Sequence, residues 1–158
     1  ILQFFVLNPI WRLGDEIRQL PLREVSKLLI SSKNLDEPIA MVGIKKPSIH
    51  FYTNKIILYE SNDDVALVNL SERLQIEKRD GWEGKYINHK TRSNTVLLVI
   101  DNQTSKYSHW SNLSPIVLGE FSIYKVWRLD RRSLEKRAAN LQINGVKPDW
   151  HLSKPERL

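Results

Sequence analysis

Apolar residues recur at helical spacing in three parts of the chain. Leu22, Val25 and Leu29 share one helical face, and Pro21 before them suits the first turn of a helix. The three helices are expected at residues 21–32, 65–70 and 131–141. Side chains that can cap the backbone amides of a helix start, Asn62-Asp63-Asp64 and Asp130, precede the last two. A short helical turn is expected at residues 47–52, followed by Asn54 in the left-handed conformation.

Short apolar runs predict strands. The expected strands are residues 38–44, 55–59, 95–100, 115–120 and 121–128. The continuous run at 38–44 is typical of a strand buried on both faces, whereas 121–128 alternates, with Phe121 and Ile123 on one face and Ser122 and Tyr124 on the other. Helices that alternate with strands favour an α/β fold, a layered αβα sandwich around a small mixed sheet of about four to five strands.

The polar stretches give the domain organisation. Residues 71–94 are the most polar, and we expect loops there with at most a short strand near Tyr86 and Ile87. The length of 158 residues and the hydrophobic content of 41% suit one domain, which we place at residues 11–145. Residues 1–10 form an apolar stub, either an edge strand or the end of a membrane helix, and residues 146–158 form an irregular tail. The chain starts at Ile1 and its only methionine is Met41, which indicates a piece of a longer product.

The positive charge is concentrated near the C-terminus. Of the net charge of +6, most belongs to residues 121–158, which hold nine basic and four acidic residues. Aromatic and basic side chains adjoin between Tyr124 and Arg128, before the basic helix that begins at Arg131. Such a segment could contact anionic lipid headgroups or nucleic acid, or be a half-buried strand followed by a solvated helix face. Composition leaves these three interpretations open.

Sequence motifs for catalysis are missing. The chain has neither a phosphate-binding glycine loop nor a Gly-x-Ser-x-Gly nucleophile motif, and it contains no cysteine. Its four histidines are dispersed, without the spacing of metal ligands. The adjacent carboxylates Asp63 and Asp64 are better explained as a helix cap than as a catalytic pair. We therefore expect no catalytic residue, metal or cofactor in this chain.

One segment carries a family resemblance. Residues 46–57 read Lys-Pro-Ser-Ile-His-Phe-Tyr-Thr-Asn-Lys-Ile-Ile. They resemble the P-S-L-x-F-Y-T-G-R-P-V pattern of bacterial polytopic glycosyltransferases of the dolichyl-phosphate-mannose protein mannosyltransferase and aminoarabinose transferase kind (GT-C type). The looser resemblance covers about residues 10–130. Asn54 replaces the usual Gly, Ile56 replaces Pro, and Lys55 replaces Arg, which keeps the charge but loses the bidentate fork.

The resemblance implies a soluble C-terminal domain that follows a transmembrane bundle on the extracytoplasmic (periplasmic) face of the cell membrane. Such enzymes transfer a sugar from a polyprenyl-phosphate donor to a lipid or protein acceptor, using carboxylates of the membrane part. The implied partners are the transmembrane part of the same polypeptide and anionic lipid headgroups or the polyprenyl-phosphate sugar, and not nucleic acid. The candidate substrate- or membrane-facing residues are Lys45, Lys46, His50, Tyr52, Lys55, Arg131 and Arg132. A basic nucleic-acid-binding module and a small stand-alone α/β enzyme remain the alternatives.

Overall fold

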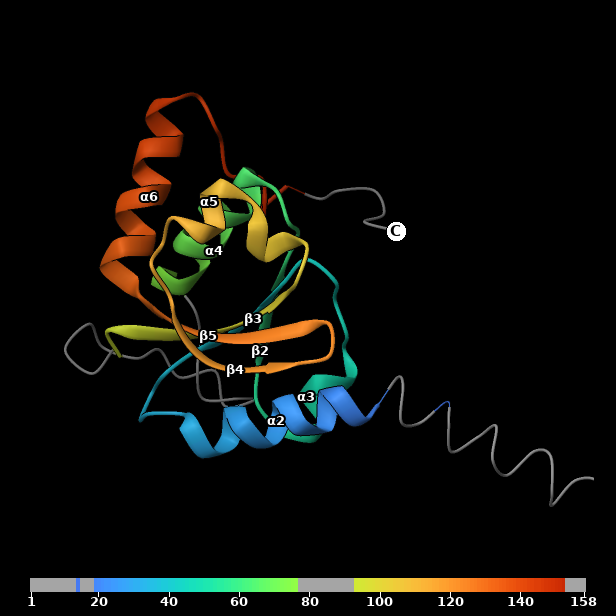
Figure 1. The fold of residues 1–158 in the computed structure, drawn as a ribbon. Coiled ribbons are helices and arrows are strands. Elements are labelled where there is room, and N and C mark those ends of the chain that lie inside the picture. The colour runs from blue at the N-terminus through green and yellow to red at the C-terminus, as the bar shows by residue number, and fades with distance from the viewer. Residues whose placement is uncertain (1–13, 15–18, 77–92, 153–158) are drawn as a thin grey trace, which may run out of the picture.

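A single mixed sheet organises the protein (Figure 1). The computed structural model describes residue 14 and residues 19–76 and 93–152. The five strands are β1 (Ile39–Val42), β2 (Ile57–Glu60), β3 (Thr95–Asp101), β4 (Ile116–Phe121) and β5 (Tyr124–Asp130), in the order β2-β1-β3-β5-β4. The first three run parallel, β5 runs antiparallel to β3, and β4 pairs with β5 at the edge. The mixed sheet of the predicted αβα sandwich is therefore confirmed.

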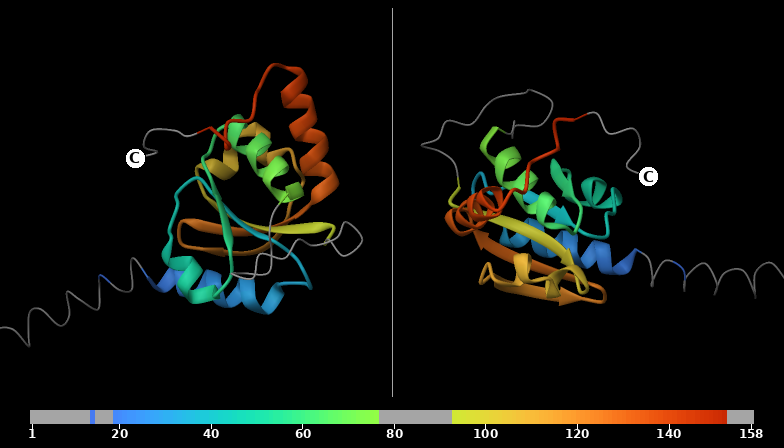
Figure 2. Two further views of the ribbon diagram at one scale, coloured as in Figure 1. Left: turned by 180° about the vertical axis from the view of Figure 1, so that it is seen from behind. Right: turned by 90° about the horizontal axis from the view of Figure 1, so that it is seen from above.

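Helices cover both faces of this sheet (Figures 1 and 2). One face carries α2 (Leu20–Ser32) and α3 (Ser48–Thr53). The other carries α4 (Asp64–Ile76), the short η4 (Thr104–Lys106) and α5 (Ser108–Ser111), and α6 (Arg131–Ile143). The chain passes from β1 through α3 to β2, and then through α4 to β3 on the other side of β1. The order of the parallel strands therefore reverses between β1 and β3.

Alternation along the strands divides the core into two halves. In β1, Ile39 and Met41 pack under α2 and α3, whereas Ala40 and Val42 pack under the helices of the opposite face. Because both faces of β1 are covered, each of its positions is buried, and the sequence shows a continuous apolar run instead of a period of two.

The predicted starts of the last two helices are confirmed by their hydrogen bonds. The Asp63 Oδ1 atom accepts from the Ala66 amide at 2.8 Å, and Asp130 Oδ2 accepts from the Ser133 amide at 3.0 Å. Both carboxylates thus satisfy amides that a helix start leaves without an intrahelical partner. Asn54 ends α3 in the left-handed conformation, with φ 50° and ψ 39°.

Several predicted boundaries differ from the structure, two of them for a clear structural reason. The expected strand at 121–128 starts instead at Tyr124, because the chain turns at Ser122 and Ile123 and pairs Phe121 with Tyr124. The polar segment expected to form loops from residue 71 is helical as far as Ile76, because its buried Leu74 packs into the core. The short strand expected near residues 86–87 and the apolar stub at 1–10 lie outside the described residues.

The segment after α6 is irregular as far as residue 152, and it is attached to α4. The Asn69 side-chain oxygen accepts from the amides of Asp149 and Trp150 at 2.9 and 3.2 Å. The indole of Trp150 donates to Glu72 Oε2 at 2.9 Å. The start of the predicted tail, as far as Trp150, is therefore attached to α4.

Candidate functional site

The carboxyl ends of β1 and β3 meet where α/β sheets usually bind ligands, at the reversal of strand order. Asp101, the last residue of β3, lies there and is 3% exposed. Its Oδ2 atom accepts from Thr104 Oγ1 at 2.6 Å and from the Ile44 amide at 3.0 Å. Its Oδ1 atom accepts from the amides of Gln103 and Thr104, both at 2.9 Å. The chain itself thus supplies four donors to this carboxylate.

These four hydrogen bonds set the charge state of Asp101. Burial alone would raise the pKa of this carboxyl group, but the bonds from Thr104, Ile44 and Gln103 outweigh burial and hold the pKa below its usual value. A carboxylate held ionised with both oxygens occupied cannot readily accept a proton from a substrate. Asp101 therefore joins the loops that follow β1 and β3.

Gly43 completes this closure. Its φ is +82°, and a Cβ atom at this position would lie 1.9 Å from Asp101 Oδ2 and 2.4 Å from Thr104 Oγ1. Only glycine fits at position 43, because the backbone φ is positive and no room is left for a Cβ atom. The hollow that remains beside it measures about 220 Å³, below the usual range for ligand pockets. Neither Gly43 nor Asp101 was identified as a site residue from the sequence. Gly43 directly follows the apolar strand β1, and Asp101 ends the apolar strand β3.

The predicted site residues Lys45, Lys46 and Tyr52, all near α3, differ in their exposure and contacts. Lys46 is exposed and Lys45 half-buried, both just before the helix. Tyr52 packs on the start of α2, since its hydroxyl donates to Gln19 Oε1 at 3.1 Å and the guanidinium of Arg23 lies 5.9 Å from its ring centre. Tyr52 is therefore chiefly a contact between helices.

His50 and Lys55 are brought together by the end of α3. The Nδ1 atom of His50 lies 2.5 Å from the carbonyl oxygen of Lys55, across the left-handed Asn54. This contact holds the backbone at Lys55, whose exposed side chain borders a hollow at the amino ends of β1 and β2. The hollow measures about 440 Å³, within the range of small-molecule pockets.

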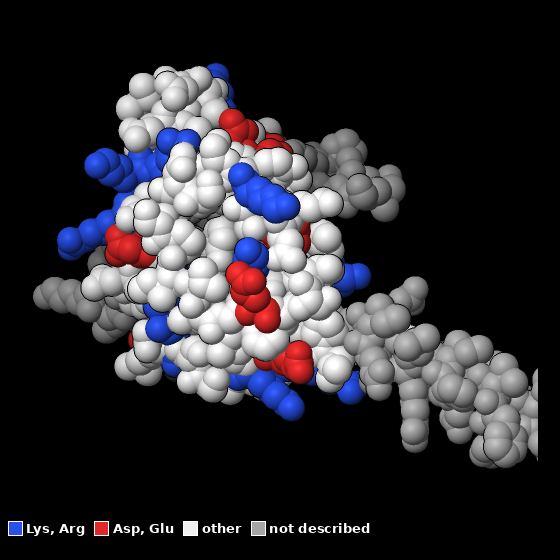
Figure 3. All heavy atoms as spheres, viewed as in Figure 1, with Lys and Arg blue, Asp and Glu red and all other residues white. Residues whose placement is uncertain are grey.

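Arg131 does not face outward, contrary to the prediction. It is 6% exposed, and its Nη2 atom donates to the Leu74 carbonyl oxygen in the last turns of α4 at 2.6 Å. Arg132 beside it is exposed, and Figure 3 shows Lys and Arg side chains gathered on the side of the molecule formed by α6. Tyr124 and Trp127 are buried, so the aromatic residues next to this basic surface belong to the core.

A buried ion pair lies beside the amino-edge hollow. Glu37 is 1% exposed, and the guanidinium of Arg128 donates to its two carboxylate oxygens at 2.9 and 3.1 Å. Thr95 Oγ1 and the Asn34 amide also donate to Glu37, and Arg128 donates to the Ser32 carbonyl. The pair therefore ties β5 to the connection between α2 and β1.

Metal clusters and membrane spans are both missing from the described part of the chain. Among residues 19–76 and 93–152, no three His, Asp or Glu side chains lie close enough to hold a metal ion. None of the described helices combines the length and the apolar character needed to cross a membrane.

Comparison with known proteins places this fold in a family. The family of the C-terminal domain of cyanobacterial RgtA-type glycosyltransferases matches residues 32–145. The chain belongs to this family. The matched segment contains all five strands and the Gly43–Asp101 closure. This match confirms the broader expectation from residues 46–57, a GT-C glycosyltransferase domain. No curated protein and no solved structure matches the chain.

Proposed function

We propose that this chain is a non-catalytic accessory domain of a polytopic membrane glycosyltransferase. The family match to a glycosyltransferase C-terminal domain is the observation that carries this proposal. In the parent protein, a sugar would pass from a polyprenyl-phosphate donor to a lipid or protein acceptor. The likeness of residues 46–57 to mannosyltransferases and aminoarabinose transferases supports a mannosyltransferase-like parent protein.

The state of the buried carboxylates supports a non-catalytic role. Glycosyl transfer requires a carboxylate or another base that can reach a proton of the acceptor. Asp101, Glu37 and Glu60 are the described carboxylates with at most 3% exposure. Asp101 accepts from two loops, Glu37 pairs with Arg128, and Glu60 Oε1 lies 2.5 Å from Arg73 Nη1. Each is engaged by the fold, so none of these three carboxylates is free to act as such a base.

The α2–α3 layer is the surface that we assign to the membrane side. Phe51 of α3 is 81% exposed, and Leu20 at the start of α2 also exposes much of its side chain. Lys45 and Lys46 precede α3, where cationic side chains suit anionic headgroups. The partner proposed for this layer is the transmembrane part of the same polypeptide with its surrounding lipid, on the extracytoplasmic face.

A transfer assay tests this function. Membranes that contain the full-length protein are incubated with radiolabelled polyprenyl-phosphate hexoses, and the label transferred to lipid or protein is counted. We expect transfer by the full-length protein, less transfer after removal of residues 19–152, and none by the isolated 158-residue chain. Transfer by the isolated chain would contradict an accessory role. A complete coding sequence without spanning apolar segments before Ile1 would contradict the membrane parent.

A further inference from the structure

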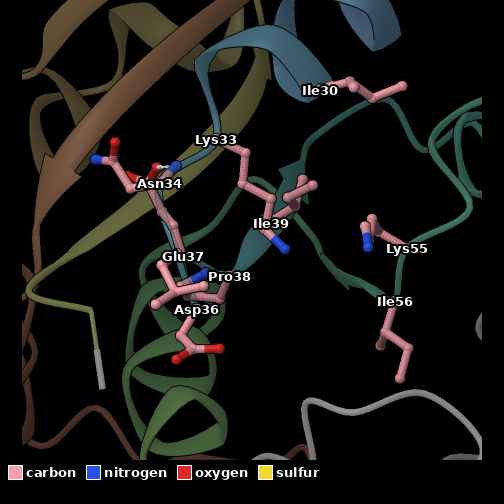
Figure 4. Close-up of a pocket in the computed structure, with 10 residues that line it drawn as sticks. Ile30, Lys33, Asn34, Asp36, Glu37, Pro38, Ile39, Lys55 and Ile56 are labelled. Carbon is pink, nitrogen blue, oxygen red and sulfur yellow. Dashed lines mark hydrogen bonds between the residues drawn. The ribbon is translucent and has the colours of Figure 1, made fainter. Parts of the chain in front are cut away.

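The hollow at the amino edge of the sheet has the features of a binding site. It lies between the end of α2, the connection from α2 to β1, and the connection from α3 to β2. Figure 4 shows side chains from these three segments surrounding one space. Its volume of about 440 Å³ is twice that of the hollow at the carboxyl edge, about 220 Å³.

The rim of this hollow is apolar and exposed. Leu35 is 89% exposed, Ile30 56% and Ile56 39%, and each comes from a different segment of the wall. Single exposed apolar residues are ordinary, but three around one opening favour contact with an apolar partner. The rim therefore suits a ligand or surface that offers hydrocarbon.

The same hollow offers positive charge. The side chains of Lys55 and Lys33 both point into it (Figure 4). Among the described residues, no hydrogen bond or ion pair to the ammonium group of Lys55 is found, and its backbone is fixed by the left-handed Asn54 and by the His50 ring. Ammonium groups beside apolar side chains are complementary to an anion attached to hydrocarbon.

Two acidic residues also line the hollow. The carboxylate of Glu37 is buried and already paired with Arg128. The side chain of Asp36 is directed away from the two lysines (Figure 4). Among the described residues neither carboxylate pairs with Lys55, so its ammonium group brings a positive charge to the hollow.

We propose that this hollow binds the phosphate head of an anionic membrane lipid. The ammonium group of Lys55 contacts the phosphate, and the first carbons of the lipid chain lie against Ile30, Leu35 and Ile56. The inference rests on the proposed function, which puts the α2–α3 layer at a membrane. It adds a lipid subsite within that layer, away from Lys45 and Lys46.

Vesicle flotation tests the cationic part of this site. The chain is mixed at low ionic strength with phosphatidylcholine vesicles, alone or with phosphatidylglycerol at about 30 mol%, a composition that gives an anionic surface. We expect binding to the anionic vesicles only. Lys55→Glu should weaken this binding roughly ten-fold or more, because each cation near an anionic surface contributes about a five-fold factor. Arg132→Glu makes the same change in net charge on α6 and should weaken binding less than two-fold.

A second pair of variants tests the apolar rim. Leu35→Ser should weaken vesicle binding several-fold, because it removes hydrocarbon contact at the opening. Ile143→Ser is the matched control, since Ile143 is 82% exposed on α6 and lies outside the hollow. Both side chains are exposed, so thermal unfolding should confirm that each variant folds like the parent. Equal effects of the two serine variants would overturn the assignment of the rim.

Inorganic phosphate distinguishes a lipid site from a free anion site. We expect that millimolar phosphate shifts no NMR signal near Lys55, whereas a short-chain phosphatidylglycerol does so at lower concentration. Equal binding of both ligands would overturn a lipid site. Equal losses in Lys55→Glu and Arg132→Glu would show diffuse attraction and overturn it too. If the chain binds no vesicle, the lipid site is wrong, while the accessory role still stands or falls on the transfer assay.

Discussion

Each edge of the sheet contains a buried carboxylate, but the partners of the two carboxylates differ. At the carboxyl edge, Asp101 takes four donors from its own chain and Gly43 lets the loops close against it. At the amino edge, the Glu37–Arg128 pair is buried beside a hollow that Lys55 and apolar side chains line. A carboxylate at the end of a parallel strand therefore indicates a ligand site only if its hydrogen-bond donors do not all come from the chain itself.

The two edges also differ in the room that they leave for a ligand. Ligands favour the carboxyl edge of an α/β sheet because loops and helix starts gather there. In this protein the same loops hydrogen-bond to each other through Asp101, so the usual position is filled. The amino edge has no such closure among the described residues, and Lys55 lies there because α3 is short and ends in a left-handed residue.

The largest expected effect comes from opening the carboxyl edge. Gly43→Ala places a methyl group within 1.9 Å of Asp101 Oδ2, at a φ of +82° that alanine rarely adopts. The loops must separate and the carboxylate must lose donors, so we expect a loss of about 4 kcal/mol in the free energy of unfolding. Urea denaturation followed by circular dichroism measures this loss.

Gly145→Ala is the matched control for this variant. Gly145 has a φ of +93°, but among the described residues nothing beyond its chain neighbours lies within 4 Å of the position that the alanine methyl group would take. Its replacement should cost only the conformational part, about 1–2 kcal/mol. Equal losses for the two variants would mean that the contact with Asp101 contributes nothing, and the carboxyl edge could no longer be called closed.

The next largest effect should come from the amino edge. Arg128→Met removes the guanidinium from Glu37, which is 1% exposed, and leaves a buried carboxylate without its cation. We expect a loss of about 3 kcal/mol in the free energy of unfolding. Replacing both partners, as in Glu37→Leu with Arg128→Met, should restore part of that loss, because no charge is then left buried.

The control is an ion pair on the surface. Lys125 Nζ lies 3.2 Å from Glu120 Oε1, and the Glu120 side chain is 60% exposed. Lys125→Met should change the free energy of unfolding by less than about 1 kcal/mol, because water screens an exposed pair. A loss in Lys125→Met as large as that in Arg128→Met would contradict the buried character of the Glu37 pair.

The sequence predicts those elements whose cause is local. Apolar runs identified all five strands, and Asp63, Asp130 and Asn54 marked helix ends, because capping depends on neighbours a few residues away. The turn at Ser122 and Ile123 escaped prediction, since it has none of the Gly or Asn-Gly signals of hairpins. An alternating pattern continues across such a turn without a break.

Site residues depend on distant partners, which is why they were predicted less well. Arg131 looks like part of a solvated basic run, yet it donates to Leu74, a carbonyl near the end of α4. Nothing in the sequence near Arg131 shows that this carbonyl lies beside it. Lys55 was identified from a pattern in residues 46–57, but the hollow beside it forms only when α2 and β1 fold next to it.

The smallest expected effect concerns an unpaired hydroxyl at the closed edge. Tyr124 pairs with Asp101 across the sheet and is 3% exposed, and its hydroxyl has no hydrogen-bond partner among the described residues. Tyr124→Phe should therefore change the free energy of unfolding at pH 7 by less than about 1 kcal/mol, because no bond is lost. Denaturation midpoints at neutral pH measure this.

The same variant should alter the alkaline limit of stability. Burial, and then the charge of Asp101, raises the pKa of Tyr124 from 10.0 to about 12 in the folded protein. Between these two values the unfolded chain has lost the phenolic proton and the folded protein still holds it, so stability falls as the pH rises. Tyr124→Phe should lessen that fall, while Tyr59, whose pKa burial also raises, keeps part of it. An unchanged alkaline slope would show that the Tyr124 hydroxyl reaches water, and that the edge around Asp101 is more open than its hydrogen bonds indicate.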